Sequence, residues 1–119
     1  GVDAGMNTLL RPALYGAYHQ IFVANKLNET QTEKVNVVGP ICENSDQLAK
    51  DRELTKTQVG DLLAILNAGA YGFGMSSQYN TRPRAAEVLG NHGRAELIRE
   101  RETFEDLHRG VKVPKRLGG

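Results

Sequence analysis

The sequence contains few sulfur-bearing and aromatic residues. It has one cysteine, two methionines and no tryptophan among 119 residues. A single cysteine excludes an internal disulfide bond and a zinc site built from several cysteines. It is typical of a reducing compartment, so we expect the protein to be cytoplasmic. Because no apolar run approaches about 20 residues and no signal-peptide pattern is present, neither a membrane span nor secretion is indicated.

The sequence also has no large excess of positive or negative side chains. Fifteen Lys and Arg are balanced by fourteen Asp and Glu, which gives a net charge of +1. The sequence therefore lacks the basic footprint of a nucleic-acid-binding domain. It also lacks a phosphate-binding P-loop, a dinucleotide fingerprint and a serine elbow.

The length predicts a single domain over residues 1–119, which is large enough to bury roughly two-thirds of its unfolded surface. The opening "GVDAGMN" has no initiator methionine. We interpret it as the start of a segment cut from a larger chain. Residues 111–119 are expected to form a loose tail.

Short apolar segments separated by polar breaks predict a mainly β fold. Residues 19–25 and 33–40 are rich in Val, Ile and Phe, as strands are, and the polar segment between them predicts a hairpin. Residues 60–70 are a further strand candidate, although a short helix would give the same pattern. Within 85–102, the glycines of "GNHG" predict a tight turn between two strands. We expect a small Greek-key-like β-barrel or sandwich with minor short helices.

Two segments have helical features. Residues 103–110 predict a short helix, because Thr103 can cap its start, acids follow, and Gly110 can end it. Residues 6–19 have helical spacing only in part, since Pro12 and a later glycine interrupt it. We expect one helical turn or an irregular segment there.

The lone cysteine lies in "GPICENSD", residues 39–46. Neighbours on a strand point to opposite faces, so Cys42 and Glu43 can address one site only at a turn. The Gly-Pro before them and the Asn-Ser-Asp after them favour such a turn. A thiol there can be a proton donor, a nucleophile or a metal ligand. The alternative is a small buried hydrophobic residue, the usual environment of a free cysteine.

Two other segments contain candidate binding residues. In residues 69–80, glycines allow a ligand to approach the backbone, and Tyr71 can offer its hydroxyl to a phosphate or carboxylate. Equally, Tyr71 can pack at a barrel corner. Arg11 precedes Tyr15 by four residues, so a helical turn would place both on one face as a carboxylate clamp. A solvated Arg11 is the alternative.

The remaining basic residues give weaker signals. Arg82 and Arg84 are assigned to surface or interface pairing. The histidines share no spacing with the cysteine that predicts a metal site: His19, His92 and His108. His19 would meet Cys42 across the predicted hairpin, which would allow a thiol–imidazole pair.

Five stretches occur in a fixed order along residues 2–107: "VDAGMNTLLRPALYGAYH", "VVGPICENSD", "LAKDREL", "GDLLAILNAGAYGFGMSSQYNTRPRAAEVL" and "LIRERETFEDL". Together they resemble the C-terminal domain of the diaminopimelate decarboxylase family, fold type III enzymes that use pyridoxal 5'-phosphate in lysine biosynthesis. The resemblance implies that an absent N-terminal α/β barrel carries the cofactor on a lysine. It also implies a homodimer with shared active sites, which converts meso-2,6-diaminopimelate to L-lysine and carbon dioxide.

The resemblance also implies roles for five residues. Arg11 and Tyr15 would bind the substrate, and Tyr71 would contact both cofactor and substrate. Glu43 would bind substrate from the partner subunit. Cys42 would be the proton donor, which suits an ordinary thiol because it stays largely protonated at neutral pH.

Departures and alternatives accompany this resemblance. The related ornithine and arginine decarboxylases usually carry aspartate after the cysteine, so Glu43 favours the diaminopimelate group. Gly74 stands where the family more often has serine. Since these residues contain no cofactor lysine and no barrel, we expect the chain alone to be inactive. The alternatives are a decarboxylase of another basic amino acid or polyamine precursor, a non-catalytic β binding module, and a thiol enzyme using Cys42 and His19.

Overall fold

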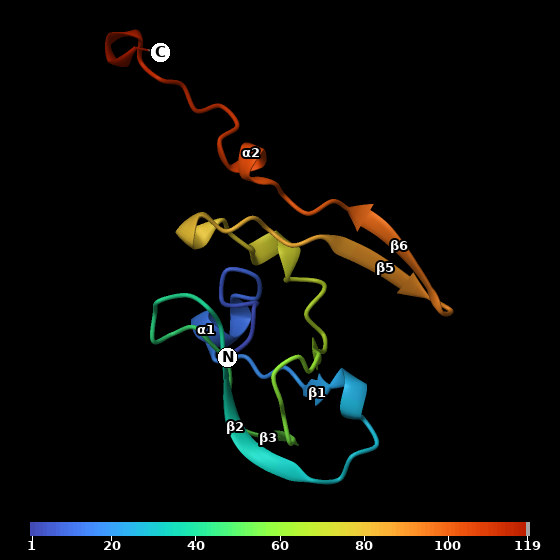
Figure 1. The fold of residues 1–119 in the computed structure, drawn as a ribbon. Helices are drawn as coiled ribbons and strands as arrows, with labels where there is room; N and C mark the ends of the chain where they lie inside the picture. The colour runs from blue at the N-terminus through green and yellow to red at the C-terminus, as the bar shows by residue number, and fades with distance from the viewer. Residues whose placement is uncertain (119) are drawn as a thin grey trace. The chain divides into compact units, whose positions relative to one another are not determined.

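The computed structural model describes residues 1–118, which fall into two compact units, Gly1–Ser77 and Gln78–Gly119 (Figure 1). The first unit contains α1 (Arg11–Tyr15), β1 (Ile21–Val23), the 3-10 turn η1 (Ala24–Lys26), β2 (Thr32–Val38), β3 (Gln47–Thr55), β4 (Leu63–Ile65) and the 3-10 turn η2 (Phe73–Met75). The second unit contains the 3-10 turn η3 (Tyr79–Thr81), β5 (Glu87–Asn91), β6 (Arg94–Arg99), α2 (Phe104–Leu107) and the 3-10 turn η4 (Lys115–Leu117). A single domain over residues 1–119 stays a prediction.

The strands of the first unit form two antiparallel pairs, β1 with β4 and β2 with β3. The predicted hairpin between residues 19–25 and 33–40 is therefore wrong, although both segments contain strands. Ile21 and Val23 are buried and pair with Ile65 and Leu63. Because both strands of this pair are apolar, they bury more surface together than β1 could against the polar face of β2.

Strand β3 has no counterpart among the strands expected from the sequence. Its regular alternation is interrupted because Leu48 and Ala49 are both buried in succession. The register passes from Val35 opposite Arg52 to Val37 opposite Ala49, so β3 has one residue more than β2 in this interval. This is a β-bulge, and a bulge hides the two-residue period from sequence inspection.

The core of the first unit consists of aliphatic side chains from the N-terminal segment and three strands: Leu9, Ile21, Val23, Val37, Leu48, Ala49 and Leu54. Helix α1 packs against β3. Pro12 lies in its first turn, and Gly16 ends it in the left-handed conformation, with φ of 62°. The expectation of one helical turn is confirmed.

The second unit contains a hairpin whose turn was expected from the sequence. Strands β5 and β6 pair antiparallel, and Asn91 lies opposite Arg94. The two residues between them, His92 and Gly93, have φ of 46° and 74°. Positive φ at both central positions is the geometry of a tight hairpin turn, so this prediction is confirmed.

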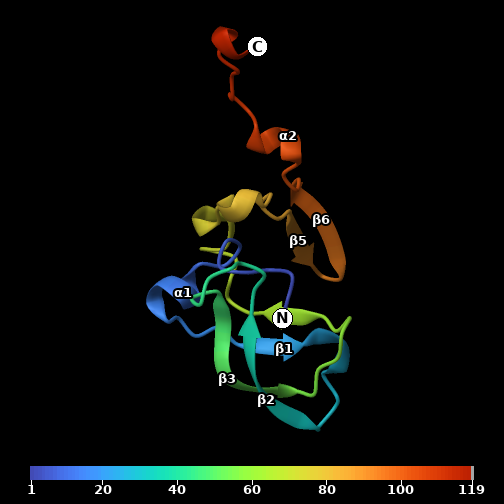
Figure 2. The same cartoon turned by 60° about the vertical axis from the view of Figure 1, so that its left-hand side comes forward.

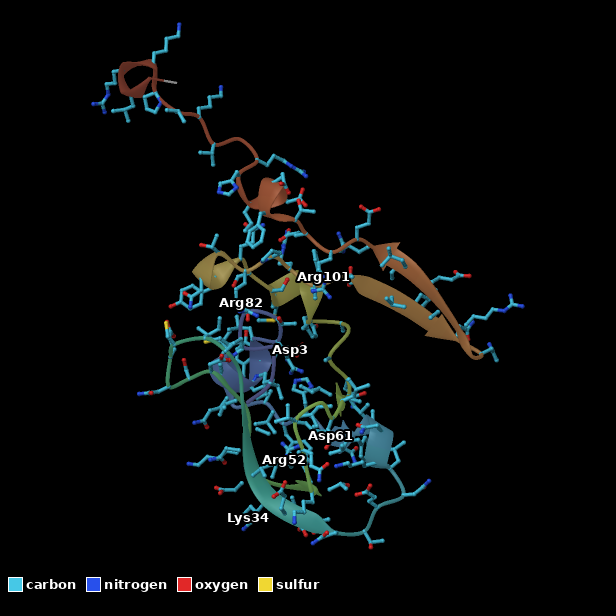
Figure 3. The ribbon with its side chains drawn as sticks, in the orientation of Figure 1. Asp3, Lys34, Arg52, Asp61, Arg82 and Arg101 are labelled. Atoms are coloured by element: carbon cyan, nitrogen blue, oxygen red, sulfur yellow. The ribbon has the colours of Figure 1, made fainter. Side chains whose placement is uncertain are left out.

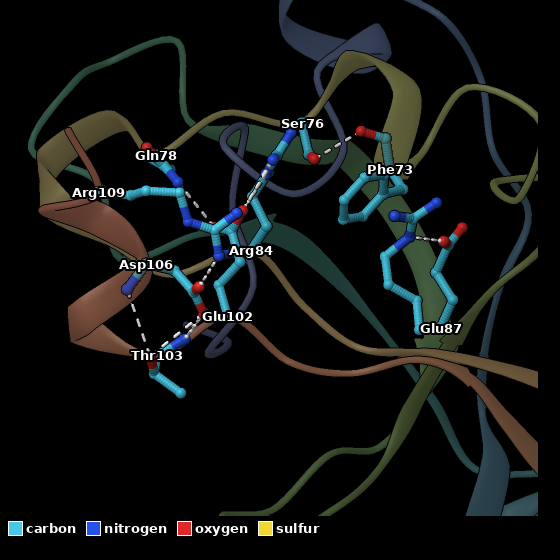
Figure 4. A network of polar contacts seen from close by, with 10 residues as sticks. Phe73, Ser76, Gln78, Arg84, Glu87, Glu102, Thr103, Asp106 and Arg109 are labelled. Atoms are coloured by element: carbon cyan, nitrogen blue, oxygen red, sulfur yellow. Dashed lines mark hydrogen bonds and ion pairs between the residues drawn. The ribbon is translucent and has the colours of Figure 1, made fainter.

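Helix α2 also begins where expected. Thr103 Oγ1 accepts a hydrogen bond from Asp106 N at 3.3 Å, and Asp106 Oδ2 accepts one from Thr103 N at 2.9 Å (Figure 4). This reciprocal pair is a capping box. The helix ends at Leu107, earlier than the predicted end at Gly110.

Glu102, just before α2, lies in a network with Arg84 and Gln78 (Figure 4). Arg84 Nε donates to Glu102 Oε1 at 2.8 Å, and Arg84 N donates to Oε2 at 2.9 Å. These bonds, the guanidinium first, lower the pKa of Glu102 from 4.5 to about 2. The expected pairing of Arg84 is confirmed.

The mainly β class with short helices is confirmed, because the strands of the described part pair as three two-stranded sheets. A closed barrel or sandwich stays a prediction. Of the expected loose tail at 111–119, residues 111–118 are exposed, and Gly119 lies outside the described residues. Over residues 1–118, no helix has the length and apolar character needed to cross a membrane.

Asp61, which lies just before β4, binds residues of η1 through its carboxylate (Figure 3). Its Oδ2 lies 2.7 Å from Lys26 Nζ and accepts from Gln58 N at 2.7 Å, and its Oδ1 accepts from Asn25 Nδ2 at 2.8 Å. These contacts, Lys26 first, lower the pKa of Asp61 from 3.8 to about 2. Because the folded-state pKa is depressed, ionised Asp61 stabilises the fold above pH 3.8, and this contribution is lost as the pH falls toward 2.

We predict that Lys26→Met raises the pKa of Asp61 toward 3.8, because it removes the strongest of these contacts. The titration of the Asp61 carboxyl carbon by NMR measures this. The matched control is Lys34→Met, since Lys34 is an exposed lysine of β2 (Figure 3). An equal shift in both variants, or an ordinary pKa for Asp61 in the unaltered chain, would contradict the assignment.

Candidate functional site

Cys42 and Glu43 lie in the loop between β2 and β3, and both are exposed. Main-chain hydrogen bonds close this loop: Gly39 N donates to Asp46 O at 3.0 Å, and Asp46 N donates to Glu43 O at 3.0 Å. The expected turn is confirmed, and the alternative of a buried Cys42 is wrong. The neighbouring Ile41 takes the buried position instead, with 6% of its surface exposed.

The carboxylate of Asp46 lies beneath this loop and is 2% exposed. Its Oδ1 accepts from Met6 N at 2.6 Å, and its Oδ2 accepts from Ile41 N at 2.7 Å. Asp46 therefore connects the loop to the segment that precedes α1. The sequence indicated Asp46 only as part of a polar turn, because no local pattern predicts that its carboxylate is buried.

The side chain of Glu43 lies over the turn. Its Oε2 is 3.4 Å from Ser45 Oγ, which is also 3.7 Å from Met6 Sδ. A contact of 3.4 Å is long for a hydroxyl donor, so Ser45 contributes little to the position of the carboxylate. The backbone of Glu43 is fixed by the loop, because Glu43 O accepts a hydrogen bond from Asp46 N at 3.0 Å.

Arg11 and Tyr71 meet directly. The guanidinium carbon of Arg11 lies 5.5 Å from the centre of the Tyr71 ring, which is within the range of a cation–π interaction. This contact connects α1 to the glycine-rich segment after β4. The structure therefore brings together two residues that are sixty positions apart in the chain.

Tyr71 is 58% exposed. The glycines around it differ in whether the structure leaves space for a side chain. A Cβ at Gly72 would lie 2.6 Å from Ala68 O, so only glycine fits there. A Cβ at Gly69 or Gly74 would meet no atom within 4 Å. Gly74 is therefore not required by space around its backbone, unlike Gly72.

Tyr15 lies at the end of α1, four residues after Arg11, and is 66% exposed. The loop of Cys42 and Glu43 runs beside α1 in both views (Figures 1 and 2). The predicted site residues of the first unit thus come from three neighbouring segments: α1, the β2–β3 loop and the segment after β4. The structure brings Arg11 into contact with Tyr71. That Tyr15, Cys42 and Glu43 face the same ligand stays a prediction.

His19 does not pair with Cys42. It is 2% exposed, its Nδ1 lies 3.0 Å from Leu66 O, and its Nε2 has no hydrogen-bond partner within the part of the chain that the structure describes. The expected thiol–imidazole pair is therefore wrong, because β1 pairs with β4 and carries His19 to the end of that strand. No group of three or more His, Cys, Asp or Glu among residues 1–118 could hold a metal ion.

A second arginine–tyrosine pair lies in the same unit. The guanidinium carbon of Arg52 is 3.9 Å from the centre of the Tyr18 ring, and its Nη1 donates to His19 O at 2.6 Å. This pair fixes the segment between α1 and β1 against β3, and neither residue was singled out from the sequence.

The chain matches proteins of known family. The family model described as "Pyridoxal-dependent decarboxylase, C-terminal sheet domain" matches residues 1–69. A relative named diaminopimelate decarboxylase from Methanothermobacter thermautotrophicus is 59% identical over 98% of this chain, and one of that name from Archaeoglobus fulgidus is 56% identical over 96%. The chain spans 27% of the length of each.

Solved structures agree with this result. The chain is similar to a crystal structure of diaminopimelate decarboxylase from M. jannaschii in complex with L-lysine, with a TM-score of 0.89 and 47% identity over 97% of this chain and 26% of that one. It is also similar to the enzyme of that name from Helicobacter pylori with L-lysine, with a TM-score of 0.81 and 46% identity over 91% of this chain and 26% of that one. The chain therefore belongs to the pyridoxal-dependent decarboxylase family, in which its first 69 residues correspond to the C-terminal sheet domain.

Proposed function

We propose that this chain is the C-terminal domain of a diaminopimelate decarboxylase, which converts meso-2,6-diaminopimelate to L-lysine and carbon dioxide. One observation carries the proposal: an exposed thiol and an adjacent carboxylate lie on a loop that runs beside α1, the helix that carries Arg11, in a chain whose relatives bear that name. We further propose that the rest of the protein is an N-terminal α/β barrel, and that the whole is a cytoplasmic homodimer with shared active sites. In that assembly this domain would complete a small Greek-key-like barrel or sandwich.

The substrate has a second amino-acid terminus remote from the carbon that loses carbon dioxide. Arg11 and Tyr15 would bind the carboxylate of this terminus, because a guanidinium presents paired donors to the two oxygens and a phenol adds a third. Glu43, reaching in from the partner subunit, would pair with its ammonium. A substrate without that terminus would leave these charges unmatched in the completed site.

Pyridoxal 5'-phosphate fits this chain at Tyr71. The phenol is exposed, and the guanidinium of Arg11 beside it favours an anionic group. We propose that Tyr71 contacts both cofactor and substrate, and that the lysine and the phosphate loop that hold the cofactor belong to the barrel. When bound, the cofactor supplies an electron sink for the electron pair left as carbon dioxide departs.

Cys42 would deliver the proton that replaces the lost carboxyl group. Its exposure allows the thiol to face a ligand in the shared site. The S–H bond breaks as the new C–H bond forms at the carbon that lost carbon dioxide. The resulting thiolate then regains a proton from water, so the enzyme returns to its starting state.

We predict that the full-length protein containing these residues, loaded with pyridoxal phosphate, releases carbon dioxide from meso-2,6-diaminopimelate and forms an equal amount of lysine. For ornithine and arginine, kcat/KM is expected to be at least about 100-fold lower, because neither has the remote carboxylate that Arg11 and Tyr15 would bind. Residues 1–119 alone, with cofactor and substrate, should release no carbon dioxide above a blank. Turnover by the isolated chain, or comparable rates with ornithine, would contradict the proposal.

We predict that Cys42→Ala lowers kcat for diaminopimelate by about 10²- to 10⁴-fold, which is the usual contribution of a general acid. Cys42→Ser should also be impaired, since a hydroxyl is a much weaker acid than a thiol. Steady-state kinetics measure both. Asn44→Ala changes an exposed side chain of the same loop and is the control. Equal losses in Asn44→Ala and Cys42→Ala would assign the effect to the loop and not to the thiol.

We predict that Arg11→Lys raises KM for diaminopimelate by about 10- to 100-fold, because a lysine cannot replace the paired donors of the guanidinium. The decrease in kcat should be smaller. Arg52→Lys makes the same change at the other arginine–tyrosine pair of this unit and should leave KM within about threefold. A normal KM in the Arg11 variant would exclude it from substrate binding.

A further inference from the structure

We propose that Asp46 is a positioning residue of the active site: its buried carboxylate holds the backbone beside Cys42 and so fixes the direction of the thiol. This inference rests on the proposed function, because it concerns the placement of the proton donor. Asp46 itself lies beneath the loop and makes no contact with substrate in this account.

The carboxylate binds main-chain amides from two distant segments. Met6 N donates to Oδ1, and Ile41 N donates to Oδ2, at 2.6 and 2.7 Å. Both distances are short for an N–H donor, as expected when the acceptor is ionised. The amide of Ile41 belongs to the residue immediately before Cys42, so the carboxylate acts one peptide away from the thiol.

The space around the carboxylate admits no larger neighbour. A Cβ at Gly5 would lie 2.7 Å from both oxygens of Asp46, and a Cβ at Gly39 would lie 2.4 Å from Oδ2. The Cβ at Gly39 would also lie 2.5 Å from the Cα of Gly5. Two glycines thus enclose the carboxylate, and the close approach of their backbones explains why glycine is required at both positions.

The amide of Met6 connects this loop to the segment before α1. Gly5 O accepts from Thr8 N at 2.9 Å and from Leu9 N at 3.0 Å, which forms the turn that leads into the helix. Met6 lies in that turn and donates to Asp46. Asp46 therefore couples the segment of the proton donor to the segment that carries Arg11 and Tyr15.

The remaining bonds of the loop are consistent with this role. Asp46 O accepts from Gly39 N, and Asp46 N donates to Glu43 O, both at 3.0 Å. The side chain of Asp46 bonds to Met6 and Ile41, and its backbone bonds to Gly39 and Glu43. Cys42 lies between Ile41 and Glu43, so the buried aspartate holds the backbone on both sides of the thiol.

The decisive variant is Asp46→Asn in the full-length protein. An amide has one acceptor oxygen, so it can retain at most one of the two bonds, and its NH2 group would face the other N–H donor. We expect kcat for diaminopimelate to fall at least about tenfold at a temperature where the variant is fully folded. We also expect the rate of Cys42 alkylation by iodoacetamide, followed by mass spectrometry of its peptide, to change at least about threefold.

Asp51→Asn is the matched control. It makes the same chemical change at an exposed position of β3 with φ of 47°, a conformation that asparagine tolerates well. We expect its kcat and its Cys42 alkylation rate to match those of the unaltered protein. If Asp46→Asn lowers only the melting temperature and keeps the kcat and the alkylation rate of the control, Asp46 has a structural role alone and the inference is overturned.

Two further measurements remain decisive should Asp46→Asn fail to fold. Gly39→Ala keeps the carboxylate but displaces it, so where this variant is folded it should lower kcat at least about tenfold and change the alkylation rate at least about threefold. In the unaltered protein, the amide of Ile41 should exchange with deuterium more slowly than the amide of Asn44 in the same loop. Rapid exchange at Ile41 would overturn the inference without any variant.

Comparison of Cys42→Ala with Asp46→Asn also separates this inference from the proposed function. If Cys42→Ala abolishes decarboxylation while Asp46→Asn behaves like Asp51→Asn, the function stands and the positioning role fails. If Cys42→Ala retains full activity, the proton-donor assignment fails, and the positioning role fails with it.

Discussion

A buried carboxylate that binds main-chain amides is the interaction on which the arrangement of the first unit depends. Asp46 is removed from water, yet each of its oxygens has a donor at short distance, so the cost of burying its charge is offset. Because its donors lie near residues 6 and 41, the carboxylate joins the entrance of α1 to the β2–β3 loop. The exposed thiol and the helix are neighbours for this reason.

Weaker interactions position other side chains of the candidate site, those of Arg11, Tyr71 and Glu43. The Arg11–Tyr71 contact is partly exposed, so it contributes roughly 0.5–1 kcal/mol and leaves the guanidinium able to bind an anion. The contact of Glu43 with Ser45, at 3.4 Å, is long for a hydroxyl donor. Buried hydrogen bonds therefore hold the backbone of this loop, and the side chains of Cys42 and Glu43 that it presents are exposed.

Local signals predicted the elements whose partners are close in sequence. The β5–β6 hairpin depends on Gly93 and its neighbours, and α2 depends on Thr103, so both could be predicted from short windows. Long-range pairing could not be predicted in this way. The β1–β4 pair depends on apolar surfaces forty residues apart, and the bulge opposite Asn36 hides the alternation of β3. The candidate site followed the same division: the resemblance supplied the roles of Cys42 and Glu43, whereas Asp46 was recognisable only from burial and distances.

The decisive measurement is a crystal structure of the full-length protein with bound L-lysine. We expect Arg11, Tyr15 and the thiol of Cys42 to lie around one lysine molecule, and the carboxylate of Asp46 to remain bonded to the amides of Met6 and Ile41. A lysine bound away from these residues, or an Asp46 carboxylate turned toward solvent with the loop displaced, would contradict it.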